Sequence, residues 1–224
     1  MARIDYSASG FEIREEILAA HEAALDRFAG AGSWWTGAQR TALIEAARDA
    51  RRQRLTPPWQ REAALPPAVS VPAEALEVAR TVAADAHRVD RDVCRRRAAE
   101  LGDAAYVEIV ALVACVSAID AFCEAIGVDP PALLEPRPGE PDRQRPEGVG
   151  DIGAFVDAAL GVPGPNVGRA LSLAPLENAT FFRLVGAMYA LEDFGAMVWE
   201  NRPLSRPQVE LVAARVSALN ECFY

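Results

Sequence analysis

A carboxylate and a thiol near the end of the sequence have the residue types and the spacing that could do chemistry. Glu210 is followed twelve residues later by Cys222. A thiol attacks a peroxide only as the thiolate, so its pKa must be lowered by a helix N-terminus, a hydrogen-bond donor or a positive charge. The attack leaves a sulfenic acid, which a second thiol converts to a disulfide that an external reductant reopens. A Cys-x-x-Cys spacing suits that sequence of steps, and a single cysteine does it poorly.

Helix geometry decides whether the carboxylate and the thiol could meet. Twelve residues of unbroken helix would separate Glu210 from Cys222 by about 18 Å along the axis and by roughly 120° around it. A proton could pass between them only if the helix breaks. Asn220 is the residue best suited to break it, because asparagine tolerates the left-handed conformation and also serves as an N-cap. Cys222 would then lie in the first turn of a following helix, where free N–H groups favour the thiolate.

The segment Leu204–Cys222 resembles the front half of a known redox motif. The motif belongs to the alkylhydroperoxidase D-like, or carboxymuconolactone decarboxylase-like, family and reads Glu-x(11)-Cys-x-x-Cys-x-x-x-His. The resemblance implies that Glu210 is the proton-relay carboxylate and that Cys222 is the first, resolving cysteine. The second, attacking cysteine and the histidine would follow Tyr224, so the site is incomplete within these 224 residues.

The same resemblance sets the expectations for function. It implies an oxidoreductase of the peroxidase-related branch, with an antioxidant activity that reduces a small hydroperoxide through a redox-active cysteine. A protein thiol would serve as the reductant, and neither a metal nor an organic cofactor would be needed. Members of the family associate through helical faces, so a homo-oligomer is expected.

Three alternatives to an active peroxidase stay open. Val209, Val212, Val216, Leu219 and Phe223 recur at helical spacing, which predicts an ordinary core stripe with Cys222 as core filler. Decarboxylase-type members of the superfamily act on a lactone acid and lack the cysteine pair. The chain could also be a truncated or degenerate helical protein without turnover, for example an assembly partner.

Length, composition and charge limit the core size, the kinds of partner, the location and the kinds of site that this chain could have. The 224 residues are 51% apolar, enough to bury one sizeable core, and the formal charge of −9 argues against nucleic acid or an anionic lipid surface as a partner. The longest apolar run, Ile109–Val116, is far shorter than a membrane span, and the first residues lack a signal peptide, so we expect a cytoplasmic protein. Four cysteines without a secretory signal predict reduced thiols. His21 and His87 have no second ligand at helical spacing, so no metal site is expected.

Alanine, leucine, glutamate and arginine dominate, which predicts an all-α protein. The resemblance implies in addition a helical bundle of the alkylhydroperoxidase D-like type, with two related helical halves. Thr36 should cap the second helix and Ser205 the last one. The helices are expected at Phe11–Phe28, Gly37–Arg54, Pro72–Leu101, Ala104–Ile126, Asp151–Leu160, Leu176–Trp199 and from Ser205 onwards.

A proline- and glycine-rich stretch at 127–150 predicts a linker or an extended wrapping segment. It would separate an N-terminal helical half, 1–126, from a C-terminal half, 151–224, that carries the partial motif. A degenerate repeat supports two halves, because Val107–Ala111 matches Val209–Ala213 and Val116–Asp120 matches Val216–Asn220. In the first copy Cys123 stands without a paired cysteine, so that copy would have kept the packing and the second the chemistry.

Overall fold

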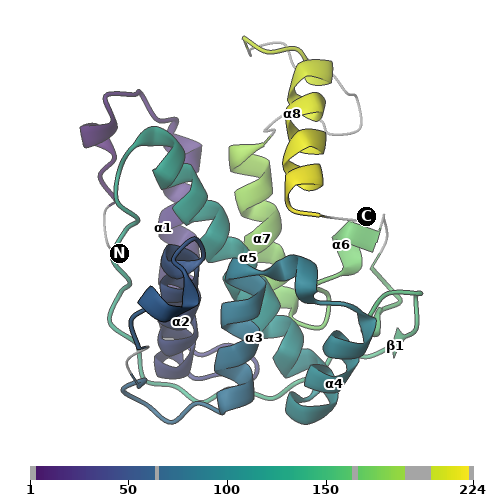
Figure 1. Cartoon of the computed structure of the whole chain (residues 1–224). Coiled ribbons are helices and arrows are strands. Elements are labelled where there is room, and N and C mark those ends of the chain that lie inside the picture. Colours follow the sequence, from purple (N-terminus) through teal and green to yellow (C-terminus); the bar gives the residue numbers. More distant parts are fainter. Residues whose placement is uncertain (1–3, 64–65, 163–165, 190–202, 222–224) are drawn as a thin grey trace.

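The computed structural model describes residues 4–63, 66–162, 166–189 and 203–221. These residues form a mostly helical protein, which confirms the all-α prediction (Figure 1). The α-helices are α1 (Glu15–Ala29), α2 (Gly37–Gln53), α3 (Ala73–Ala84), α4 (Arg91–Leu101), α5 (Asp103–Ile126), α6 (Asn166–Arg169), α7 (Pro175–Met188) and α8 (Arg206–Leu219). Short 3-10 turns lie at Ser7–Ser9, Pro58–Gln60 and Ala86–Arg88.

Helix α5 lies at the centre of the bundle (Figure 1). It packs against α1, α2, α3, α4 and α7, and fourteen of its 24 residues are buried. An all-round apolar sequence explains this position, because a helix without a polar face must be covered on every side. By length and composition alone α5 could also cross a membrane. Its buried faces hold Glu108 and Asp120 as well as apolar side chains.

The first two helices follow their sequence signals closely. Thr36 caps α2, where its hydroxyl accepts from the N–H of Gln39 and the Gln39 carboxamide accepts from the N–H of Thr36. Helix α1 begins at Glu15, four residues later than Phe11, and buries Leu25 and Phe28 against the core. The capping prediction for Thr36 is therefore confirmed.

The predicted single helix over Pro72–Leu101 is wrong. The chain leaves helical geometry at Asp85, which has φ −141°, and then forms a 3-10 turn. Asp90 starts α4 by accepting a hydrogen bond from the N–H of Val93. An aspartate that caps a new helix competes with continuation of the old one, and this local competition overrode helix propensity.

The predicted helix at Asp151–Leu160 is also wrong. Two short antiparallel strands occupy this region, β1 (Val149–Gly150) and β2 (Ala158–Ala159). Gly153 has φ +81° between them, a conformation that favours glycine and turns the chain back. The N–H of Ala159 donates to the hydroxyl of Ser172, which fixes the hairpin beside the segment that precedes α7.

The stretch 127–150 is extended up to β1 and wraps around the helices. The backbone N–H of Arg137 donates to the carbonyl of Ala29, and its side chain pairs with Asp26 on α1. Arg145 reaches Asp103 at the start of α5. The extended wrapping that the composition predicted is confirmed.

Helices α7 and α8 follow this segment and differ in their surroundings. Helix α7 packs against α1 and α5, and Leu184 and Ala187 join the same core. The predicted helix Leu176–Trp199 is described only to Tyr189, so its remainder lies outside the described residues. Helix α8 stands beside α7 at the edge of the molecule, and none of its residues is buried (Figure 1).

Candidate functional site

Glu210 lies in the second turn of α8. Its carboxylate accepts a hydrogen bond from Arg206 Nε at 3.0 Å, one helical turn earlier, and its side chain is 44% exposed. Burial and a hydrogen bond to Glu210 raise the pKa of the Tyr189 hydroxyl at the end of α7. The carboxylate of Glu210 is therefore oriented by two neighbours and still reaches solvent.

Helix α8 begins and ends at the residues that the sequence indicated. Ser205 is the N-cap, and both its N–H and its hydroxyl donate to the carboxamide of Gln208. The helix ends at Leu219, Asn220 follows as the C-cap, and Glu221 has φ +54°. The predicted break near Asn220 is therefore confirmed, and the chain turns between Glu210 and Cys222. Cys222 itself lies outside the described residues, as does Phe223 of the predicted core stripe.

The other members of that stripe do not form a core within the chain. Val212, Val216 and Leu219 are 50–65% exposed, and Val209 is half-buried. The alternative that treats this stripe as ordinary core packing is therefore wrong for these three side chains.

The three described cysteines are reduced and buried. Burial raises the pKa of the Cys94 and Cys123 thiols, and it raises that of Cys115 to about 12. Thiols with raised pKa values are mostly protonated near neutral pH and react slowly with peroxides. Cys94, Cys115 and Cys123 are therefore packing residues.

Cys123 belongs to a chain of polar contacts that crosses the core. Its sulfur lies 3.5 Å from the Tyr6 hydroxyl, which is 2.8 Å from His21 Nδ1. The other ring nitrogen of His21 lies 3.3 Å from the sulfur of Met188 on α7. Burial lowers the pKa of His21 to about 4, so the imidazole is neutral and its two nitrogens are satisfied inside the protein. This chain of contacts stabilises the docking of α7 on α1.

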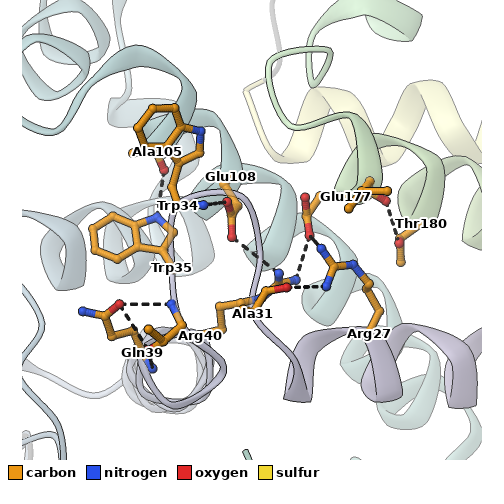
Figure 2. A network of polar contacts seen from close by, with 12 residues as sticks. Arg27, Ala31, Trp34, Trp35, Gln39, Arg40, Ala105, Glu108, Glu177 and Thr180 are labelled. Atoms are coloured by element: carbon orange, nitrogen blue, oxygen red, sulfur yellow. Dashed lines mark hydrogen bonds and ion pairs between the residues drawn. The ribbon is translucent and has the colours of Figure 1, made fainter. Parts of the chain in front are cut away.

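Sequence reasoning missed a buried group of charges, which we call the arginine–carboxylate cluster: Arg27, Arg40, Glu108 and Glu177 (Figure 2). Arg40 lies between the two carboxylates, 3.5 Å from Glu108 and 2.9 Å from Glu177. Arg27 approaches Glu177 from the other side at 3.1 Å. The side chains of Arg40, Glu108 and Glu177 are fully buried. The cluster joins four helices, α1, α2, α5 and α7.

Burial dominates the electrostatics of this cluster. It raises the pKa of Glu108 to about 7, although Arg40 acts in the opposite direction, and it lowers the pKa of Arg40. The second Glu108 oxygen accepts from the N–H of Trp34 at 2.8 Å. Gly32 passes so close that a Cβ there would lie 1.8 Å from Glu108 Oε1. These enclosed groups hold the helices together and present no side chain to a substrate.

One signal in the sequence could have revealed the cluster. Glu108 interrupts the apolar run Tyr106–Val113, and a carboxylate inside such a run needs a buried cation. Nothing local identifies Arg40 or Glu177 as its neighbours, because they come from distant helices. In the repeat, Glu108 matches Glu210, yet Glu108 is enclosed and Glu210 reaches solvent.

Asp120, which lies twelve residues after Glu108, forms a bidentate pair with Arg48 of α2. Helix α5 runs unbroken through both positions, so Glu108 and Asp120 serve separate arginines. Among the residues that the structure describes, no three His, Cys, Asp or Glu side chains gather in a way that could hold a metal ion. Neither His21 nor the exposed His87 is part of such a group.

Comparisons with protein-family models, with curated proteins and with solved structures found no significant match.

Proposed function

We propose that this chain reduces hydroperoxides through Cys222, as a helical protein of the alkylhydroperoxidase D-like type. The observation that carries the proposal is the end of α8 at Leu219, between Glu210 and Cys222. A continuous helix would keep the carboxylate and the thiol about 18 Å apart. A turn at Asn220 and Glu221 allows the chain to fold back toward the exposed carboxylate.

The described thiols add support by elimination. Cys94, Cys115 and Cys123 are buried and have raised pKa values, so thiol chemistry in this chain belongs to Cys222. Glu210 is the positioned carboxylate on the same segment, and Arg206 holds it in place.

In the motif that the segment resembles, Cys222 is the resolving thiol and the second cysteine attacks. Within these 224 residues we assign the attack to Cys222 itself, because the three other thiols are buried. The Cys222 thiolate attacks one peroxide oxygen, so an S–O bond forms, the O–O bond breaks, and the alcohol leaves with a proton delivered by way of Glu210. The sulfur is oxidised to a sulfenic acid and the peroxide is reduced. A thiol of the protein reductant then displaces water to form a mixed disulfide, and a second thiol of that reductant restores Cys222.

Sulfenic acid trapping tests the proposal. The purified chain is mixed with tert-butyl hydroperoxide and dimedone, and each cysteine peptide is quantified by mass spectrometry. We expect a dimedone adduct on Cys222, none on Cys94, Cys115 or Cys123, and slower formation in Glu210→Gln. Cys123→Ser is the matched control and should label as the wild type does. A Cys222 that stays unlabelled at saturating peroxide contradicts the proposal.

A second candidate, a non-catalytic assembly partner, is favoured by one observation. The apolar residues of α8 are exposed, which is typical of a surface that another protein covers. An unlabelled Cys222 in a chain that self-associates would select this function over peroxide reduction.

A further inference from the structure

A small hollow lies where α3, α4 and α5 pack against one another (Figure 1). Its volume is about 200 Å³. The hollow exists because α3 and α4 are separate helices: the chain turns at Ala86–Arg88, and residues on both sides of the turn line it. Neither Glu210 nor a cysteine is among the described residues that line it. The inference drawn from it therefore does not rest on the chemistry proposed for Cys222.

The inner wall of the hollow is apolar. Val78 of α3 and Tyr106 of α5 are buried, and the half-buried residues around them are Val82, Val89 and Val93. The Tyr106 hydroxyl is hydrogen-bonded to the Cys94 thiol, which leaves only the hydroxyl of Thr81 as an uncharged polar group on this wall. An apolar group placed in the hollow would remove these side chains from water. The inner wall therefore favours a ligand with an apolar body.

The mouth of the hollow is positively charged. Three arginines line it, Arg88, Arg96 and Arg97, and among the described residues Glu77 is the one carboxylate that does so. Arg97 is already occupied, because it pairs with Glu77 on α3 and with Glu100 on α4. Arg88 and Arg96 are exposed, and neither makes an ion pair within the described parts of the chain. Two guanidinium groups are therefore available to an anion.

This local charge is opposite in sign to the charge of the whole chain. Residues 88–97 hold five arginines and two aspartates, a net charge of +3, whereas the chain carries −9. Arg91 of this segment is used elsewhere, since it donates to the carbonyls of Gly153 and Ala154. An acidic surface repels small anions over most of its area. The mouth of the hollow is an exception to that repulsion.

We propose that this hollow binds a small monocarboxylate with an apolar body, such as an arylacetic acid. The ring lies against the valines and Tyr106, and the carboxylate lies between Arg88 and Arg96. A planar guanidinium donates two parallel hydrogen bonds to a carboxylate, which suits this arrangement. A cavity of about 150 Å³ holds benzene, so the volume of about 200 Å³ accommodates a benzene ring with a short acidic arm.

Other small ligands fit this hollow less well. Inorganic phosphate would satisfy the arginines but would leave the apolar wall in water. An amine would be repelled by the guanidinium groups of Arg88 and Arg96. An uncharged aromatic molecule would cover the wall without using either arginine. Only an apolar carboxylate matches both the wall and the mouth.

A titration of para-fluorophenylacetate into the whole chain, followed by fluorine NMR, tests the site. We expect saturable binding with a Kd of about 0.1 to 1 mM, which is the strength available to a ligand of about ten non-hydrogen atoms. The uncharged para-fluorophenylacetamide should bind about tenfold more weakly, because it lacks the charge that the guanidinium groups attract. Absence of saturable binding up to about 10 mM, or equal binding of the amide, overturns the proposal.

Substitutions test the mouth and the wall separately. Arg88→Gln and Arg96→Gln should each weaken binding about tenfold, because each removes a charged hydrogen bond. Arg95→Gln is the matched control: it makes the same change of charge on α4, but Arg95 lines a different hollow, beside Asp103. Val93→Phe fills the apolar part of the hollow and should abolish binding.

Circular dichroism shows whether each variant keeps its helix content. Arg88 and Arg96 are exposed, so their variants decide the question even where Val93→Phe does not fold. Binding that is unchanged in both arginine variants, that Arg95→Gln weakens equally, or that persists in a folded Val93→Phe overturns the proposal. None of these results bears on peroxide reduction, which sulfenic acid trapping at Cys222 measures independently.

Discussion

Helices α5 and α8 carry the two matching segments of the sequence and have opposite surroundings. In α5, Ile109 and Val116 are enclosed on every side, and Glu108 is paired with buried Arg40. In α8, the matching Leu211 and Val216 are exposed, and Glu210 contacts Arg206 on its own helix and Tyr189 at the end of α7. The same pattern of residues therefore serves as the centre of a core in one place and as a surface in the other. The difference shows that burial is decided by the neighbours that the fold supplies.

The largest expected effect on the free energy of unfolding comes from truncating Ile109 of α5, with its match in α8, Leu211, as the comparison. Ile109→Ala should lower the free energy of unfolding by about 4 kcal/mol, because it leaves a cavity in a closed core. Leu211→Ala should lower it by less than about 0.5 kcal/mol, because that side chain is already in water. Urea denaturation at low protein concentration measures both. Equal losses for the two variants would contradict the comparison, since they would mean that Leu211 is buried in the folded chain.

The second prediction concerns how the free energy of unfolding changes with pH, which depends on the buried carboxylate of Glu108 and on the neutral imidazole of His21. Glu108 has a folded pKa of about 7, above its unfolded value, so its cost to stability grows as the pH rises from about 4.5 to 7 and reaches at most about 3 kcal/mol. His21 has a folded pKa of about 4, below its unfolded value, so its cost grows as the pH falls from about 6.5 to 4. In the wild type, these two contributions therefore change the free energy of unfolding in opposite directions as the pH rises.

Substitutions separate these two contributions. In Glu108→Gln, stability should rise with pH between about 4 and 6.5, because the opposing contribution of Glu108 is removed and that of His21 remains. In His21→Phe, stability should fall with pH between about 4.5 and 7 for the converse reason. Urea midpoints at a series of pH values give both profiles. Two variants with the same slope would contradict the opposite signs assigned here.

A smaller effect is expected from adding one methyl group beside α5. Gly32→Ala should destabilise the protein by about 2 kcal/mol, because the new Cβ would overlap the enclosed carboxylate of Glu108. Gly186→Ala, in the interior of α7 with open space around it, should stabilise by about 0.5 to 1 kcal/mol. Thermal and urea unfolding of the two variants provide the measurement. Tolerance of alanine at Gly32 would show that the loop around Glu108 can move away.

The smallest effect compares two helix caps. Thr36→Ala should lower the global free energy of unfolding by about 1 kcal/mol, since α2 is part of the core. Ser205→Ala should cost α8 a similar amount, but the loss should appear as faster amide exchange within α8 alone. Hydrogen exchange followed by mass spectrometry distinguishes the two. A global loss of protection in Ser205→Ala would show that α8 unfolds together with the bundle.

Local sequence signals were enough to predict much of the fold. Thr36 and Ser205 mark helix starts because their side chains take part in hydrogen bonds at the first turn, and Asn220 marks the end of α8 for a similarly local reason. The same local rules could have divided α3 from α4, since Asp90 caps the first turn of α4. The prediction of one continuous helix followed helix propensity and periodicity and did not use this cap. Local rules could not have predicted the hairpin of β1 and β2, because its position depends on Ser172 in a later segment.

Some features of the candidate site could likewise be predicted from the local sequence, and others depend on distant segments. Its members Glu210 and Cys222, and the break between them, follow from spacing and residue type along one short segment. The arginine–carboxylate cluster does not, because Arg40 meets Glu177 only after α2 and α7 have packed on α5. Glu108 signalled that some cation must be near, and the fold determined which one.

The sequence alone determined that this protein is helical, where most helices begin and end, and that a carboxylate and a thiol flank a break in the last helix. These features depend on interactions within a few residues, which the order of the chain specifies directly. Only the tertiary structure decided that one copy of the repeat is the core and that the other exposes its apolar side. That outcome depends on contacts between distant segments, and the energy of burying a side chain is set by whatever packs against it.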